Sequence, residues 1–80
     1  MRTDTGWRSC PNDTDVRIVG RYTLQAWDSF NRTGSYWGIW DRRGIRRGGS
    51  DTGVPSRQQA KSAATRDARR LLKKGGETDG

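Results

Sequence analysis

A helix over residues 57–74 is the most sharply bounded element that this chain predicts. Ser56 is a favoured N-cap residue, and Gln59, three positions later, completes a capping box. Two glycines at positions 75 and 76 follow the segment, and glycine readily ends a helix. One face of the helix carries an apolar stripe over an arc of about 120°, which consists of Ala60, Ala64, Ala68, Leu71 and Leu72. The small side chains of this stripe predict a helix axis that lies close against a sheet.

The segments before the helix predict a sheet. Residues 15–27 alternate with a period of two, which is typical of a strand with one buried and one polar face. Residues 28–35 are rich in turn formers, and residues 36–41 form a second strand. A tight turn at 41–44 leads into a short third strand over residues 45–47. One face of the first strand collects Ile18, Gly20, Tyr22, Leu24 and Ala26, and the other collects Arg17, Val19, Arg21, Thr23, Gln25 and Trp27.

The second strand carries aromatic side chains on both faces. Trp37 and Ile39 lie on one side, whereas Tyr36 and Trp40 lie on the other. The period alone leaves open which pair is buried. Gly38, between them, allows an aromatic ring from the neighbouring strand to lie across the backbone.

The predicted fold class is α+β: a three-stranded antiparallel sheet with one C-terminal helix packed on one face, in the order β-β-β-α. The chain has 80 residues, of which only 29% are hydrophobic, so it forms a single thin domain. We assign this domain to residues 15–74, with residues 1–14 as a flexible N-terminal arm and residues 75–80 as a disordered tail. The second face of the sheet is left open.

The charge balance indicates a polyanionic partner. Sixteen Lys and Arg residues oppose nine Asp and Glu residues, which gives a formal net charge of +7. A small basic protein of this kind is typical of nucleic-acid binders, ahead of proteins that bind anionic membranes. A basic surface kept for solubility is the alternative.

Several function classes find no support in the sequence. The chain has no histidine and no P-loop, and we predict neither an enzyme nor a bound metal or cofactor. Its single cysteine, Cys10, excludes an internal disulfide. No apolar stretch reaches the length of a transmembrane helix, and we expect a soluble, cytoplasmic protein.

The first candidate site is an arginine cluster around the turn and the third strand. It comprises Arg42, Arg43, Arg46 and Arg47. These like charges repel one another in the free protein, so a bound anion would stabilise them. Edge-strand charge that prevents aggregation is the alternative, although fewer charges would suffice for that.

The second candidate site is the polar face of the first strand. It comprises Arg17, Arg21, Thr23, Gln25 and Trp27. A short sheet can enter the major groove of DNA, where arginine reads guanine and glutamine reads adenine. An ordinary solvated face, with Trp27 shielded by the N-terminal arm, is the alternative.

The third candidate site is the first turn of the helix. Arg57 and Lys61 lie on the same arc as the alanines, where a helix that packs on a core would not favour charge. If the helix start projects past the sheet edge, these side chains and the free backbone N–H groups meet a phosphate together. The opposite helix face, which we interpret as solvated, carries Arg66, Arg69, Arg70 and Lys73.

The segment SRQQAKSAATRDA, at 56–68, resembles the last helix of double-stranded-RNA-binding domains. In that family a glycine-rich loop, a serine cap and a basic helix start precede a ladder of alanines. The resemblance implies that Arg57 and Lys61 hold phosphates across a groove. Gln58 departs from the basic residue usual in the family, and residues 1–14 do not resemble the helix with which the family begins.

The layout of three strands and a helix is similar to that of the amino-terminal arm-binding domains of tyrosine-family integrases. Those domains insert an open sheet face into a DNA major groove and need no preceding helix. This resemblance implies a DNA-binding role and an origin in a phage or another mobile element.

We therefore expect a non-enzymatic protein that binds duplex DNA, with double-stranded RNA as the second choice. The competing class is a protein-interaction module that docks on a host protein, because Trp and Arg are enriched in interface hot spots. The arrangement of the aromatic side chains discriminates between the two classes. Interleaving of Trp27, Tyr36 and Trp40 with arginine favours nucleic acid, whereas an apolar patch separate from the arginines favours a protein partner.

Overall fold

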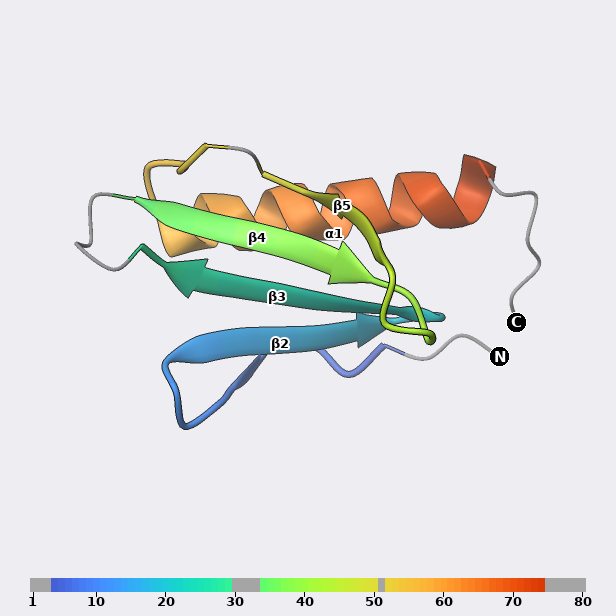
Figure 1. Ribbon diagram of the computed structural model, residues 1–80, viewed down its shortest axis with the longest axis horizontal. Helices are drawn as coiled ribbons and strands as arrows, with labels where there is room; N and C mark the ends of the chain where they lie inside the picture. Colours follow the sequence, from blue (N-terminus) through green and yellow to red (C-terminus); the bar gives the residue numbers. More distant parts are fainter. Residues whose placement is uncertain (1–3, 30–33, 51, 75–80) are drawn as a thin grey trace.

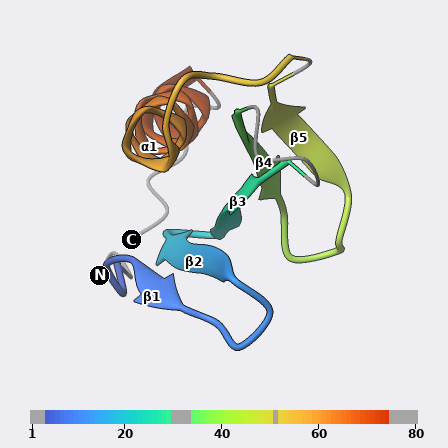
Figure 2. The same cartoon turned by 90° about the vertical axis from the view of Figure 1, so that its left-hand side faces the viewer.

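A computed structural model describes residues 4–29, 34–50 and 52–74 of the chain. Within these residues, five strands form one antiparallel sheet, and a single helix lies across one of its faces (Figures 1 and 2). The strands follow one another in space in the same order as in the sequence. The elements are β1 (Arg8–Ser9), β2 (Thr14–Val19), β3 (Tyr22–Asp28), β4 (Ser35–Trp40), β5 (Arg46–Gly49) and α1 (Arg57–Lys74).

The α+β class and the C-terminal helix are confirmed, but the predicted number of strands is wrong: the sheet has five strands, not three. One additional strand arises because the predicted strand over 15–27 folds back on itself. Gly20 adopts a φ of 61°, and Val19 pairs with Tyr22 across a two-residue turn. The segment is therefore the hairpin β2–β3 rather than one bent strand.

This turn also changes which side chains are buried. In a hairpin, directly paired residues share a face, so odd-numbered residues of β2 lie on the same face as even-numbered residues of β3. Val19 is consequently buried, whereas Ile18, which the sequence pattern assigned to the core, is 38% exposed. Tyr22, Leu24 and Ala26 are buried as predicted.

The other additional strand lies in the segment predicted to be a flexible arm. In β1, Arg8 pairs with Val16 of β2, and Asp4 forms an isolated bridge to Val19. The side chain of Trp7 packs against the hydrophobic core. Within residues 4–14, therefore, Asp4, β1 and Thr14 pair in the sheet, and a turn at 11–13 joins β1 to β2. The first three residues of the arm and the whole of the predicted tail, 75–80, lie outside the described residues.

The helix α1 covers the range that the sequence predicts. The backbone N–H of Gln59 donates to the Ser56 hydroxyl oxygen at 3.2 Å, as expected of an N-cap. The helix packs mainly on β3 and β4, and its stripe of small residues lies against Leu24 and Ile39, both fully buried. The buried residues of the stripe are Ala60, Ala64, Ala68 and Leu72.

The sheet face away from α1 carries the remaining aromatic residues. Ile39 faces the helix, and Trp37 packs against the core, which answers the question that the period left open. Tyr36 and Trp40 therefore lie on the other face. The ring beside Gly38 is that of Trp40, two positions along the same strand, and not a ring from a neighbouring strand.

The third predicted strand occurs as β5, one residue later than expected, and the register with β4 shifts between Ile39 and Trp40. Ile45, its only predicted apolar residue, precedes the strand and is 49% exposed. Among the described residues, no helix combines the length and apolarity that crossing a membrane requires.

Candidate nucleic-acid interface

Arginines from two separate turns meet at one end of the sheet. One turn joins β2 to β3 and carries Arg21, and the other joins β4 to β5. The two turns enclose a shallow pocket of about 380 Å³. We call it the arginine pocket; it is lined by Arg21, Tyr22, Asp41, Arg42, Arg43 and Arg47.

Asp41 organises the turn that supplies most of this pocket. One of its carboxylate oxygens accepts hydrogen bonds from the backbone N–H groups of Arg43 (2.9 Å) and Ile45 (3.0 Å). The other oxygen accepts from Nε of Arg47 at 2.9 Å. These bonds, chiefly the one from the Ile45 backbone N–H, lower the pKa of Asp41 below its ordinary value. The carboxylate is therefore ionised at neutral pH and already occupied by the turn itself.

The arginine pocket keeps a large excess of positive charge. Arg42 and Arg43 are exposed, and neither forms an ion pair with any carboxylate in the described part of the chain. The guanidinium of Arg21 lies 5.4 Å from the centre of the Tyr22 ring. Four guanidinium groups thus surround one carboxylate. An anion with several oxygens would relieve their repulsion and accept several charge-assisted hydrogen bonds.

The open face of the sheet carries a row of aromatic side chains on β3 and β4. The Trp27 ring lies 6.4 Å from that of Tyr36, nearly parallel to it, and 6.4 Å from that of Trp40. Arg46 of β5 extends over Trp40, with 5.9 Å between its guanidinium carbon and the ring centre. We call Trp27, Tyr36 and Trp40 the aromatic row. One arginine is therefore stacked on the row itself.

Polar side chains complete the open face. Thr23 pairs with Trp40 and Gln25 pairs with Gly38, so both lie on the same face as the aromatic row. Thr23 is also the immediate neighbour of Tyr22, which lines the arginine pocket. Because neighbouring residues of a strand point to opposite faces, Tyr22 lies on the helix side, and the arginine pocket is at the end of the sheet rather than part of the open face.

The register places a further arginine on this face. Arg8 pairs with Val16, which in turn pairs with Gln25, so these three residues share the open face. The sequence pattern did not indicate Arg8, because its segment resembles an arm. The signal that would have found it is the turn sequence at positions 11–13, which joins β1 to β2.

Arg17 does not lie on the open face, and that part of the second candidate site is wrong. Its Nε and Nη2 donate to the two carboxylate oxygens of Asp4 at 2.8 and 2.7 Å, and its Nη1 donates to the hydroxyl of Thr65 in α1 at 3.3 Å. The cause is the turn at Gly20, which places odd-numbered residues of β2 toward the helix.

The first turn of α1 has carboxylate partners within the protein. Arg57 lies 2.7 Å from a carboxylate oxygen of Asp28 and 3.6 Å from those of Asp13 and Asp15. These charges, chiefly the hydrogen bond to Asp28, raise the pKa of Arg57. Carboxylates of the protein itself therefore balance the charge of Arg57, which weighs against the third candidate site as an anchor for phosphate.

Lys61 is held in the same way. Its Nζ lies 2.6 Å from a carboxylate oxygen of the buried Asp15 and 5.7 Å from the centre of the Trp7 ring. The hydrogen bond from Lys61 is the main reason that the pKa of Asp15 is lowered. The two basic residues on the alanine arc thus face carboxylates of the sheet and its loops rather than the apolar core.

Comparison with known proteins finds no matching family model, no matching curated protein and no matching solved structure. The resemblances to double-stranded-RNA-binding and integrase arm-binding domains therefore stay predictions. In the part of the chain that the structure describes, no three His, Cys, Asp or Glu side chains are grouped so as to hold a metal ion.

Proposed function

We propose that this protein is a non-enzymatic binder of duplex nucleic acid, with DNA preferred to RNA. The observation that carries the proposal is the arginine pocket, in which two turns and β5 bring four arginines together with one carboxylate that the β4–β5 turn already occupies. A phosphodiester backbone is the biological polyanion that matches such a pocket, because arginine binds phosphate bidentately.

The open face supplies the side chains that would contact base edges in the major groove of DNA. Strands can enter the major groove of B-DNA, and the open face at the centre of the sheet, on β3 and β4, carries the side chains that would contact it. Gln25 offers the amide that pairs with adenine, and Arg46 offers the guanidinium that pairs with guanine. The aromatic row, interleaved with Arg46, provides apolar contact for sugars and thymine methyl groups.

The first test compares ligands of equal length. The intact protein is titrated with duplex DNA, duplex RNA and single-stranded DNA at several salt concentrations, with binding followed by fluorescence anisotropy. We expect duplex DNA to bind most tightly and its affinity to fall steeply with salt, since each phosphate contact adds about 0.9 to the slope of log K against log [salt]. An affinity that does not depend on salt, or a preference for the single strand, contradicts the proposal.

The second test removes charge from the arginine pocket. We expect a variant with Arg42, Arg43 and Arg47 replaced by Ala to bind duplex DNA at least tenfold more weakly, with a salt slope smaller by about two. Its matched control removes three charges from the far side of α1, through replacement of Arg70, Lys73 and Lys74 by Ala. Each triple includes one arginine with an aspartate partner, Arg47 with Asp41 and Arg70 with Asp67. Equal losses in the two triples would show a diffuse charge effect and refute the pocket.

A protein partner is the second candidate, because Ile18 is 38% exposed on the open face, beside Thr23 in the register. A protein that docks there would bury Ile18 and the aromatic row. A further variant distinguishes the two candidates: replacement of Ile18 by Ser would weaken a protein complex strongly and a phosphate-dominated complex little.

A further inference from the structure

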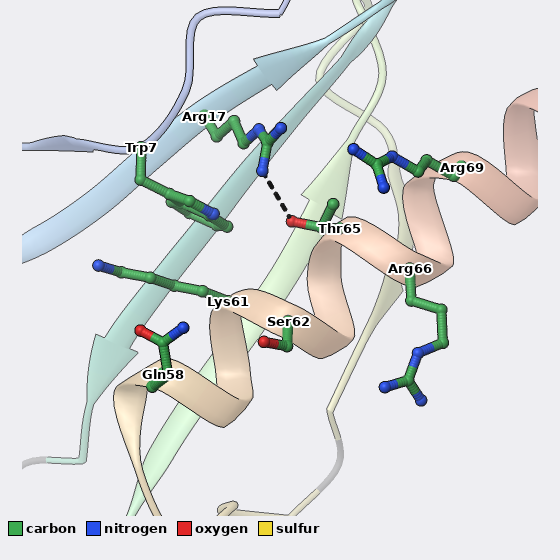
Figure 3. A pocket seen from close by; sticks show the side chains of 8 residues that line it. All are labelled: Trp7, Arg17, Gln58, Lys61, Ser62, Thr65, Arg66 and Arg69. Atoms are coloured by element: carbon green, nitrogen blue, oxygen red, sulfur yellow. Dashed lines mark hydrogen bonds between the residues drawn. The ribbon is translucent and has the colours of Figure 1, made fainter.

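On the helix side of the sheet, α1 and the N-terminal strands enclose a second hollow of about 590 Å³ (Figure 3). Trp7 and Arg17 extend into it from the N-terminal segments, and Lys61, Thr65 and Arg69 line it along α1. We call this hollow the helix groove. It lies on the opposite face of the sheet from the aromatic row, so it is separate from the surface proposed to bind duplex DNA.

Positive charge exceeds negative charge in the helix groove. Four cationic side chains line it, and among the described residues two carboxylates, those of Asp4 and Asp15, pair with two of them. These carboxylates hold Arg17 and Lys61 in fixed positions. The two remaining cations are exposed and form no ion pair with a carboxylate of the described residues; they are Arg66 and Arg69.

The groove also contains a hydroxyl group that can donate a hydrogen bond to a ligand. The Thr65 hydroxyl oxygen accepts a hydrogen bond from Nη1 of Arg17 at 3.3 Å. Because this oxygen acts as the acceptor, the hydroxyl hydrogen remains available to donate to a ligand. In Figure 3, Arg69 extends from α1 toward Arg17, next to this hydroxyl. Two guanidinium groups and a hydroxyl therefore lie near one another, beside the Asp4 carboxylate to which Arg17 donates.

The geometry points to a second anion site: we propose that the helix groove binds the phosphate group of a ligand, between Arg17, Thr65 and Arg69. A tetrahedral phosphate presents enough oxygens to accept from all three side chains, and charge-assisted hydrogen bonds of this kind are the strong ones. Trp7 forms the apolar wall on which the rest of such a ligand rests. The phosphate belongs either to a small phosphorylated molecule or to a second segment of nucleic acid, and its chemistry in the groove is the same.

The test uses pyrophosphate as the probe and follows it by NMR. The reporters are the indole N–H of Trp7, identified by its loss in Trp7→Phe, and the Nε–H of Arg17. Ionic strength is held constant with chloride. We expect both signals to shift and saturate with pyrophosphate, and we expect Arg69→Ala to weaken the apparent affinity about tenfold, as loss of a charged hydrogen bond does.

The matched control is Arg70→Ala, which removes the same charge from the next residue of α1, outside the groove. We expect it to leave the affinity for pyrophosphate within about twofold, since Arg70 does not line the groove and its exposed guanidinium already pairs with Asp67. Signals that do not move, or equal losses in Arg69→Ala and Arg70→Ala, would overturn the proposal.

A second titration distinguishes the two sources of phosphate. It adds a short DNA duplex to the variant with Arg42, Arg43 and Arg47 replaced by Ala, in which the arginine pocket is disabled. Shifts of the same two reporters support the groove as a site for a second nucleic-acid segment; shifts with pyrophosphate alone support a small phosphorylated ligand. Because the groove reporters lie on the other face of the sheet, failure of the groove leaves binding at the arginine pocket measurable, and the reverse also holds.

Discussion

Gly38 lies in the middle of β4, where the six-membered ring of Trp40 covers its Cα atom. A Cβ atom at this position would lie 2.7 Å from Cζ3 of that ring, closer than real Cβ contacts come. The indole can lie flat on the open face, near Trp27, only because residue 38 has no side chain. One glycine thus determines the shape of the aromatic row.

We expect Gly38→Ala to displace the Trp40 ring and to lower the free energy of unfolding by about 1–3 kcal/mol, the usual effect of overpacking. Urea denaturation followed by tryptophan fluorescence measures the loss, and the native emission spectrum reports the displaced ring. Gly53→Ala is the control, because a Cβ atom there would make ordinary contacts at 3.6 Å. A Gly38→Ala protein as stable as Gly53→Ala would show that the ring can move at little cost.

At the scale of single residues, local chemistry allowed part of the site to be predicted. The arginines of the β4–β5 turn follow from neighbours in the sequence. The ring at Gly38 was expected from a neighbouring strand but belongs to Trp40 of the same strand. The partners of Arg17, Arg57 and Lys61 do not follow from neighbours in the sequence, because the carboxylates that pair with them come from other elements. Ion pairs across the fold have no periodic signal in the sequence.

At the scale of elements, α1 was predicted with its correct ends, because its cap, its stripe and its terminating glycines are all local. The hairpin β2–β3 was not predicted, for a physical reason. Its turn has only two residues, and apolar and polar residues continue to alternate through it. A period of two therefore cannot distinguish one long strand from two short ones joined by a tight turn.

The alanine stripe sets the distance between α1 and the sheet. We expect Ala64→Leu, at a fully buried position above Leu24 and Ile39, to destabilise the protein by about 1–3 kcal/mol or more, because the helix would have to move away from the sheet. Thermal denaturation by circular dichroism measures the change. The control is Ala63→Leu, a partly exposed position on the same helix turn, for which we expect a shift in melting temperature of no more than a few degrees. Equal shifts would mean that the stripe does not limit the packing.

At the scale of the whole molecule, ion pairs with aspartates determine which basic residues keep an unbalanced positive charge. Each aspartate in the described part of the chain forms an ion pair with an arginine or lysine: Asp4, Asp13, Asp15, Asp28, Asp41 and Asp67. The surplus of cations is thereby left in the arginine pocket, on β5 and along α1. The net charge alone indicated a polyanionic partner but not which surfaces keep that charge.

Because of these ion pairs, the free energy of unfolding depends on pH. The pKa of Asp4 is lowered from 3.8 to about 2, and that of Asp15 is also lowered. A carboxyl group whose pKa is lower in the folded state stabilises the fold above its unfolded pKa, and this contribution is lost as the pH falls through the folded pKa. We therefore expect the free energy of unfolding to be insensitive to these groups above about pH 5 and to fall between about pH 4 and pH 2.

Replacement of Asp15 by Asn tests this dependence. We expect Asp15→Asn to lower the free energy of unfolding at pH 7 by about 2 kcal/mol, because Lys61 loses its partner at a nearly buried site, and to make the acid-induced decline shallower. Urea denaturation at a series of pH values measures both effects. The control is Asp67→Asn, whose partner Arg70 is 72% exposed and for which we expect a change within about 0.5 kcal/mol. If the free energy of unfolding of Asp15→Asn fell at low pH as steeply as that of the unaltered protein, Asp15 would not contribute to the decline.

The simple order of the strands has a consequence for how the protein forms during synthesis. Each strand pairs with the one made just before it, so the sheet can assemble step by step as the chain leaves the ribosome. The apolar face of the sheet, with Leu24 and Ile39, is covered mainly by α1, which follows all five strands in the sequence. A nascent chain that stops before α1 would leave this face exposed to solvent and become a substrate for chaperones, whereas addition of α1 closes the core in a single step.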